Sequence, residues 1–221
     1  MSELTLYHGS QVVVGKPVFG FGKATNDYGR GFYCTESEDL AKEWACQYNR
    51  QGYSNRYCLE TDGLKILDLE SDEYNAMNWV AVLLNNRRIE FLGEAEEDRV
   101  EKIIRMYSVN VEAYDVVSGY RADDSYFMFA EQFISGAISY EKLSAALRLG
   151  GFGIQVVLKS KKAFDRIEYI GAEEAYPETY YQRFISREQS ATEEYNRLSR
   201  KGGSGSSGTF VYDIIEGRMS V

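Results

Sequence analysis

The sequence predicts a single α+β domain, and three observations lead to this expectation. Strand-like and helix-like segments alternate along the 221 residues without an internal repeat. The hydrophobic share of 44% and the charged share of 27% are ordinary for a globular protein of this length. No second hydrophobic core follows the Gly/Ser-rich stretch at 201–210. We therefore expect a domain over residues 1–200, with residues 201–221 forming a Gly/Ser loop and a C-terminal strand or tail packed on the same domain.

The first expected strand covers residues 4–10, LTLYHGS, because apolar residues alternate along it before a Gly-Ser pair breaks the pattern. Residues 14–31 are rich in glycine and hold one of only two prolines in the chain. Such a composition predicts a long loop between the first strand and the next element.

A second strand is expected at 31–35, GFYCT, followed by a helix through 38–49. Thr35 or Ser37 is placed to cap this helix, because a hydroxyl ahead of the first turn accepts hydrogen bonds from backbone N–H groups that have no partner in the helix. Three side chains at helical spacing support the helix: Leu40, Trp44 and Tyr48.

The remaining elements follow from the same two periodicities. In chain order they are a strand, a turn at Asp62-Gly63 and another strand within 54–69, helices at 72–92 and 95–107, an apolar run in 113–127 that leads into a helix ending near Ile134, a helix within 139–153, a strand, turn and last strand within 154–170, and a segment with helical charge spacing at 178–200.

Composition also narrows the classes of function. A net charge of −9 argues against broad contact with duplex nucleic acid, although a local basic patch could still hold a nucleic acid. With one histidine and three cysteines without a CxxC motif, a zinc site would need unusual ligands, and this composition predicts a reduced, cytoplasmic protein. No secretory signal and no apolar run long enough for a transmembrane helix is visible.

The single histidine, His8, is the first candidate site residue. A lone histidine at a strand end is most often structural, bonded within the fold. Two neighbours raise the odds of a ligand site: a Gly-Ser pair that lets a ligand approach the backbone, and the glycine-flanked Tyr33 further along the chain.

The stretch YGRGFY, residues 28–33, is the second candidate. Arg30 lies between two glycines and offers a charged fork suited to phosphate. Tyr33 could present a flat face to a heteroaromatic ring, and Tyr28 could cover the other side of that ring. The alternative is a glycine turn that leads into a buried aromatic strand.

Together these stretches resemble the nicotinamide pocket of the ADP-ribosyltransferase superfamily, in its diphtheria-toxin and poly(ADP-ribose) polymerase branch. The blocks that carry the resemblance are LYHGS, DYGRGFYCTESEDLAKEWA, YDVVSGYRADD and IQVVLKSKKAFDRIEYI, scattered over residues 4–170. They are similar also to a small bacterial, toxin-like family long described as a domain of unknown function. The resemblance implies a split antiparallel β-sheet core with flanking helices over the domain at 1–200.

The resemblance also implies roles for individual residues, with NAD as co-substrate. His8 would hydrogen-bond the adenosine ribose, Tyr33 would stack on nicotinamide, and the Gly9 backbone would hold the carboxamide. The full set of expected NAD-binding residues is His8, Gly9, Ser10, Tyr28, Arg30, Gly31, Phe32 and Tyr33.

A third catalytic group is expected beside His8 and Tyr33. Enzymes of this branch commonly use a glutamate that grips the nicotinamide ribose, and Gln155 is the position that we align with it. An amide can hold a hydroxyl but offers no full negative charge. Asp123 and Asp124 are the alternative source of a carboxylate, and either one could instead cap the following helix.

The resemblance therefore implies a mono-ADP-ribosyltransferase that transfers ADP-ribose from NAD to a protein or nucleic-acid acceptor and releases nicotinamide. Related small bacterial proteins resemble toxins or phage-defence effectors, so an antitoxin or immunity protein is an expected partner. Two alternatives stay open: an NAD glycohydrolase, and a non-catalytic module that binds NAD, ADP-ribose or a partner protein.

Overall fold

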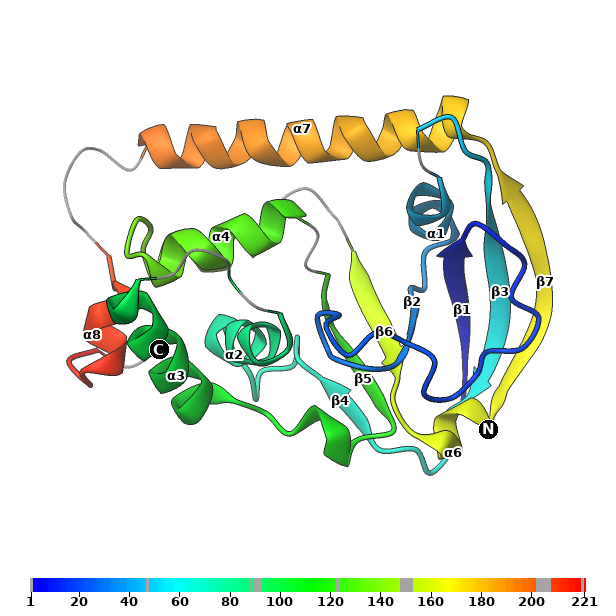
Figure 1. The fold of residues 1–221 in the computed structure, drawn as a ribbon, viewed down its shortest axis with the longest axis horizontal. Coiled ribbons are helices and arrows are strands. Elements are labelled where there is room, and N and C mark those ends of the chain that lie inside the picture. The colour runs from blue at the N-terminus through cyan, green and yellow to red at the C-terminus, as the bar shows by residue number, and fades with distance from the viewer. Residues whose placement is uncertain are drawn as a thin grey trace.

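The computed structural model describes residues 2–46, 48–87, 89, 93–121, 124–147, 153–201, 208–219 and 221. Its strands form two sheets, and helices flank both of them (Figure 1). The α+β class predicted from the sequence is confirmed. Within this described part, no helix has both the length and the apolar character needed to cross a membrane.

The first sheet has the strand order β1-β3-β7 and is antiparallel throughout. Its strands are β1 (Glu3–Ser10), β3 (Gly52–Glu60) and β7 (Ile167–Ala175). His8 of β1 lies opposite Asn55 of β3 in the register of this sheet. Strand β7 ends at Ala175, five residues past the block 154–170 in which the sequence predicts the last strand.

The second sheet has the order β2-β6-β5-β4. Its strands are β2 (Phe32–Cys34), β6 (Ile154–Leu158), β5 (Val116–Tyr120) and β4 (Ile66–Asp68). The β4–β5 pair is parallel, so this sheet is mixed at one edge, whereas the expected core is an antiparallel sheet. Parallel neighbours need a long crossover, and the chain between β4 and β5 provides one through the helices α2 (Ala76–Asn86) and α3 (Glu94–Tyr107).

The two sheets meet where β1 and β2 run side by side. Tyr7 and Thr35 form an isolated antiparallel bridge, with the Tyr7 N–H 2.8 Å from the Thr35 carbonyl and the Thr35 N–H 2.9 Å from the Tyr7 carbonyl. This bridge brings His8 of β1 next to Tyr33 of β2, although the long loop separates them in sequence.

Helix α1 (Glu38–Ala45) covers β1 and β3. Ser37 is its cap, since its side chain accepts from the Leu40 N–H at 3.3 Å. The helix packs so closely on β1 that a Cβ at Gly9 would clash with the Ala41 carbonyl oxygen. Glycine at position 9 is thus required by the packing of α1.

The larger hydrophobic cluster lies on the side of the second sheet that faces α2, α4 (Asp124–Ile134) and α5 (Tyr140–Leu147). Val117 of β5 and Val157 of β6 contribute to it from the sheet. Its largest fully buried side chains are Trp79, Tyr28, Phe129, Phe133, Leu67, Met77, Leu83 and Ile103. This cluster packs the helices against the second sheet.

Shorter elements complete the fold. A 3-10 turn η1 (Val111–Ala113) precedes β5, and the connection between β6 and β7, expected as a turn, contains the helical turn α6 (Lys161–Phe164). Helix α7 (Pro177–Lys201) crosses one side of the molecule in Figure 1 and contacts α1. The Arg187 guanidinium pairs with the buried Glu43 carboxylate of α1 at 2.8 and 2.9 Å.

Of the two forms expected for the C-terminal segment, a strand or a packed tail, the strand does not form. Residues 211–215 form helix α8 and not a strand. Val211 and Ile214, three residues apart, fall on one helix face and are 0% and 1% exposed within the larger cluster. The segment is thus a tail docked on the core, while most of the preceding Gly/Ser stretch, residues 202–207, lies outside the described residues.

Candidate functional site

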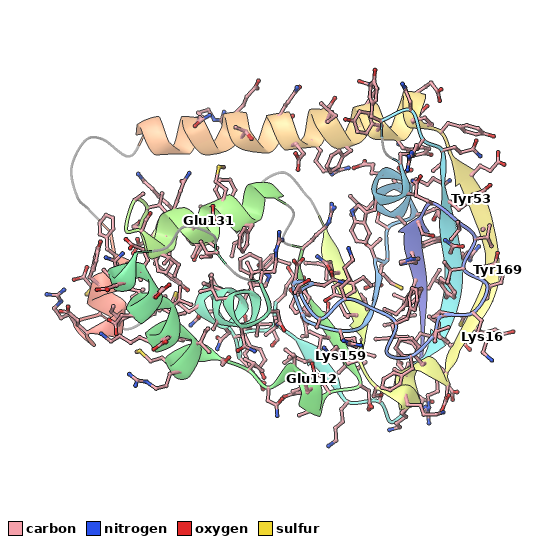
Figure 2. All side chains as sticks on the ribbon, in the orientation of Figure 1. Lys16, Tyr53, Glu112, Glu131, Lys159 and Tyr169 are labelled. Carbon is pink, nitrogen blue, oxygen red and sulfur yellow. The ribbon has the colours of Figure 1, made fainter. Side chains whose placement is uncertain are left out.

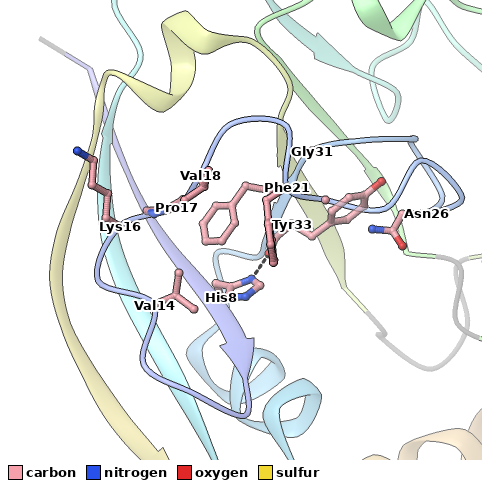
Figure 3. Close-up of a pocket in the computed structure, with 11 residues that line it drawn as sticks. His8, Val14, Lys16, Pro17, Val18, Phe21, Asn26, Gly31 and Tyr33 are labelled. Carbon is pink, nitrogen blue, oxygen red and sulfur yellow. Dashed lines mark hydrogen bonds between the residues drawn. The ribbon is translucent and has the colours of Figure 1, made fainter.

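A cavity of about 380 Å³ opens between the long loop and the adjoining strands β1 and β2 (Figure 3). Its size lies near the lower end of the range for small-molecule sites, about 300–1,000 Å³. The residues that line it are His8, Val14, Lys16, Pro17, Val18, Phe21, Gly22, Asn26, Gly31, Phe32 and Tyr33. Both principal candidates from the sequence, His8 and Tyr33, therefore line one cavity.

His8 is fixed by a hydrogen bond to the neighbouring strand. Its Nδ1 lies 2.7 Å from the Tyr33 carbonyl oxygen, and its ring is 4.4 Å from the Phe32 ring between centroids. A carbonyl oxygen only accepts, so Nδ1 carries the proton in this contact. Burial lowers the pKa of His8, and the bond to Tyr33 offsets only part of this effect. The imidazole is thus neutral at pH 7, and Nε2 is the nitrogen able to accept a hydrogen bond from a ligand hydroxyl.

Tyr33 is fixed by its hydroxyl. The phenol donates to the Gly29 carbonyl oxygen at 2.6 Å and accepts from the Tyr28 N–H at 3.0 Å. The turn that brings these groups together needs a left-handed conformation, and Gly29 provides it at φ +73°. Burial raises the pKa of Tyr33 far above its ordinary value, so the phenol stays protonated. Tyr33 is therefore suited to be a flat wall and not an acid or base.

Tyr28 does not face the cavity, contrary to its expected role as a second wall. Its side chain is fully buried, and its hydroxyl donates to the Tyr120 carbonyl oxygen at 2.6 Å. The ring fills the space in front of Gly119 of β5, where a Cβ would clash with the Tyr28 hydroxyl. Tyr28 is a core residue that anchors the loop.

Arg30 also lies away from the cavity lining. Its exposed guanidinium donates to the Gly20 carbonyl oxygen at 3.0 Å and so ties two parts of the long loop together. Lys16 is the cationic side chain among the lining residues.

Gly9 contributes to backbone packing, and Ser10 makes hydrogen bonds at the start of the long loop. Gly9 packs against α1, as described above. The Ser10 hydroxyl donates to the Val12 carbonyl oxygen at 2.6 Å and accepts from the Asn55 amide at 3.0 Å. Gly31 and Phe32, by contrast, line the cavity as expected.

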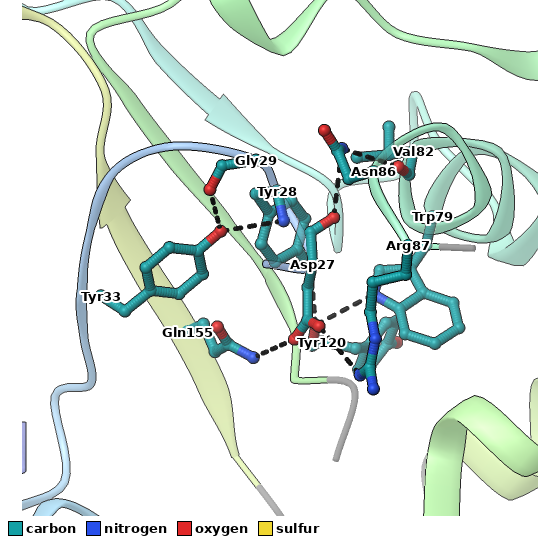
Figure 4. A network of polar contacts seen from close by, with 10 residues as sticks. All are labelled: Asp27, Tyr28, Gly29, Tyr33, Trp79, Val82, Asn86, Arg87, Tyr120 and Gln155. Carbon is teal, nitrogen blue, oxygen red and sulfur yellow. Dashed lines mark hydrogen bonds and ion pairs between the residues drawn. The ribbon is translucent and has the colours of Figure 1, made fainter. Parts of the chain in front are cut away.

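Gln155 is buried in β6, and its amide Nε2 donates to Asp27 Oδ2 at 2.8 Å (Figure 4). It is not one of the residues that line the cavity. The side chain of Asp124 and the whole of Asp123 lie outside the described residues, although α4 begins at Asp124. The third catalytic group expected from the sequence therefore stays a prediction.

Sequence reasoning missed Asp27, which the structure places beside Gln155. A signal for it was present, because Asp27 is the only acidic residue in the glycine-rich loop 14–31. The residue is 9% exposed, and its Oδ1 lies 3.2 Å from the Arg87 guanidinium. A buried carboxylate this close to the candidate site is typical of a functional position as well as of a structural ion pair.

Asn55 was missed as well. It is fully buried in β3, donates to the His8 carbonyl oxygen at 3.0 Å, and accepts from the Val14 N–H at 2.7 Å. These bonds attach the start of the long loop to the strand that carries His8. Asn55 thus fixes one wall of the cavity relative to the imidazole.

Lys159 supports the opposite end of the loop. Its buried ammonium lies 2.6 Å from Glu112 Oε1 and donates to the Tyr28 carbonyl oxygen at 2.7 Å. Figure 2 shows Lys159 and Glu112 side by side at the foot of the second sheet. Because Tyr28 also donates to the Tyr33 hydroxyl, this contact stabilises the position of the cavity wall.

Comparisons with known proteins give one family. A family model described as "Protein of unknown function (DUF3990)" matches residues 4–169. The match spans every described candidate residue of the cavity and ends within β7, before α7 and α8. No curated protein matches the chain, and no solved structure matches it.

Proposed function

The chain belongs to the family of unknown function DUF3990, and on that premise we propose from its cavity that it is an NAD-dependent mono-ADP-ribosyltransferase. It transfers ADP-ribose to a protein or nucleic-acid acceptor and releases nicotinamide. Its two sheets correspond, in this proposal, to the split sheet of the His–Tyr branch of ADP-ribosyltransferases. A role as a toxin or defence effector, held in check by an antitoxin or immunity protein, belongs to the same proposal.

One observation supports this function above the others: His8 and Tyr33, 25 residues apart in sequence, line the same cavity and share a hydrogen bond. The two residues come from different sheets, so neither helical nor strand periodicity would bring them together. A neutral imidazole beside a fixed phenol ring suits a ligand with a sugar hydroxyl next to a flat heteroaromatic ring.

The chemistry requires little covalent work from the protein. The bond between ribose and nicotinamide breaks, its electron pair leaves with nicotinamide, and positive charge develops on the ribose, as in glycoside cleavage. His8 Nε2 accepts from a hydroxyl of the adenosine ribose, the other sugar of NAD, and so orients the dinucleotide. Tyr33 covers the pyridinium ring, whose positive charge favours the face of an aromatic side chain.

The cavity is large enough for part of the dinucleotide. In this proposal, about 380 Å³ holds the nicotinamide against Tyr33, with the adenosine ribose at His8 of the same lining and the remainder of NAD outside the cavity. In this proposal the exposed Lys16 is the cationic side chain of the lining that is available to the pyrophosphate.

A non-catalytic binding module is the second candidate. It is favoured by the lining itself, since Gln155 and every described acidic side chain are absent from it. Such a module would bind NAD or ADP-ribose without breaking the ribose–nicotinamide bond.

The test is incubation with NAD labelled in the adenylate half, with and without cell lysate, followed by measurement of free nicotinamide and of label on macromolecules. Label on macromolecules supports the transferase, and nicotinamide without such label would replace it with a glycohydrolase. Saturable NAD binding without either product would leave the binding module. His8→Ala and Tyr33→Ala should each abolish turnover, while Tyr48→Phe, at a 71% exposed tyrosine, serves as the matched control.

A further inference from the structure

The carboxylate of Asp27 is held from two sides close to the cavity wall. Gln155 donates to Oδ2 at 2.8 Å, and the Arg87 guanidinium lies 3.2 Å from Oδ1 (Figure 4). The Asn86 amide also donates to the backbone carbonyl of Asp27 at 3.3 Å. Both the side chain and the main chain of Asp27 are therefore oriented by residues of other elements.

Asp27 belongs to the turn that surrounds the Tyr33 hydroxyl. Asn26 lines the cavity, Tyr28 donates to the Tyr33 hydroxyl, and Gly29 accepts from it. The negative charge of Asp27 is also one of the causes that raise the pKa of Tyr33. The carboxylate thus acts electrostatically on the residue that forms the cavity wall.

The register of the second sheet places Gln155 on the same side as Tyr33. Tyr33 lies opposite Val157, and Gln155 lies two residues before Val157 on β6. Alternate residues of a strand point to the same face, so Gln155 and Tyr33 project from one face of the sheet. The Gln155 amide that orients Asp27 therefore lies on the same face of the sheet as Tyr33.

Two positive charges lie near this loop, and each has a further contact. The Arg87 guanidinium lies over the Phe127 ring at 4.3 Å as well as next to Asp27, and the Lys159 ammonium pairs with Glu112. Arg87 Nη1 donates to Asp27 Oδ1 at 3.2 Å. A carboxylate that receives an amide proton and faces a guanidinium keeps its charge when buried.

We propose that Asp27, oriented by Gln155, supplies the negative charge that favours a cationic ring against Tyr33. This inference rests on the proposed function for the identity of the ligand, a pyridinium. Gln155 is then a positioning residue. The carboxylate that a glutamate would supply at position 155 comes instead from Asp27 of the neighbouring loop. The alternative is an ion pair that only fastens the loop to α2.

A pair of small probes separates these readings. Nicotinamide is neutral and 1-methylnicotinamide is a cation of nearly the same shape, so the ratio of their dissociation constants, measured by calorimetry, reports the charge felt in the cavity. Wild type should bind the cation more tightly than the neutral ring. In Asp27→Asn, which keeps the size of the side chain, this preference should fall about tenfold while nicotinamide affinity stays within about twofold.

The exchanged variant carries the decisive test. Asp27→Asn combined with Gln155→Glu again places one amide against one carboxylate, with their positions reversed, and should recover most of the preference for the cation. Asp165→Asn is the control, because it removes one negative charge from an exposed residue of the turn after α6. It should leave the ratio unchanged.

Three results would overturn the inference: an equal preference in wild type and Asp27→Asn, no recovery in the exchanged variant, or no binding of either probe to wild type. If Asp27→Asn does not fold, wild type alone still tests the inference, because equal affinity for the cation and the neutral ring would overturn it. NAD turnover by wild type is scored separately. A cation preference without NAD turnover would support the inference and contradict the transferase proposal. NAD turnover without a cation preference would support the transferase proposal and contradict the inference.

Discussion

Nδ1 of His8 lies 2.7 Å from the backbone carbonyl oxygen of Tyr33, and this contact sets the chemistry of both residues. It leaves Nε2 as the nitrogen that can accept from a ligand, and it couples the imidazole to the strand that carries the phenol. A change in the protonation of His8 should therefore be visible in the stability of the whole junction between the two sheets.

The first prediction concerns pH. Burial lowers the pKa of His8 in the folded state below the value near 6.5 that it has when unfolded. The unfolded state then binds more protons, so the free energy of unfolding should fall as pH drops through about 6.5 and level off below the folded pKa. The measurement is urea unfolding of wild type and His8→Phe between pH 8 and pH 5.

His8 is the only histidine in the chain, so the difference between the two pH profiles isolates its contribution. Carboxylates that titrate in the same range are common to both proteins and cancel. Parallel profiles would mean that His8 has the same pKa in the folded and unfolded states, and the neutral imidazole would have to be abandoned.

The second prediction separates the ring of Tyr33 from its hydroxyl. Tyr33→Phe keeps the flat wall but leaves the Gly29 carbonyl and the Tyr28 N–H without the hydroxyl. We expect the free energy of unfolding to fall by about 1–3 kcal/mol, while nicotinamide binding is largely kept. Chemical denaturation and calorimetry measure the two effects, with Tyr48→Phe as the matched control. Full stability together with lost binding would contradict the assigned role of the hydroxyl.

The third prediction tests the contact between β1 and α1. Gly9→Ala adds a Cβ that meets the Ala41 carbonyl oxygen and lies 2.9 Å from the Ala45 backbone nitrogen. Because backbone atoms on a packed helix cannot move aside cheaply, the variant should lose about 2–4 kcal/mol of stability. Gly171→Ala in β7 is the control, since nothing lies within 4 Å of its Cβ. Similar melting temperatures for the two variants would refute the close packing.

The elements that could be predicted from the sequence are those set by residues close together in the chain. The strand at β1 and the helix α1 follow from the spacing of apolar residues and from a Ser37 cap, all of which lie within a few residues of one another. The parallel pairing of β4 with β5 was not predictable in this way, because Val116 meets Ile66 from a distant part of the chain. Pairing partners depend on the global topology, which periodicity does not encode.

The candidate site shows the same division. Tyr28 and Tyr33 have similar glycine-rich surroundings in sequence, yet one ring is buried in the core and the other lines the cavity. The backbone turn at Gly29 sends the two rings in different directions, and the direction of such a turn cannot be predicted from residue types alone. Asp27 was overlooked because its partners, Gln155 and Arg87, come from elements far along the chain.

The last prediction concerns the buried support of the loop. Lys159→Met removes an ammonium that is 1% exposed and leaves the Tyr28 carbonyl oxygen without its donor. Glu112 is 68% exposed and can be solvated, so the loss should stay near the cost of one unsatisfied buried group, about 1–3 kcal/mol. Lys161→Met, at a 72% exposed lysine paired with Asp165, should change stability by less than about 0.5 kcal/mol. Tyr28 also donates to the Tyr33 hydroxyl, a contact whose complete loss in Tyr33→Phe is expected to leave nicotinamide binding largely intact. Lys159→Met should therefore lower stability without a large loss of nicotinamide binding, and lost binding in a folded variant would contradict this separation.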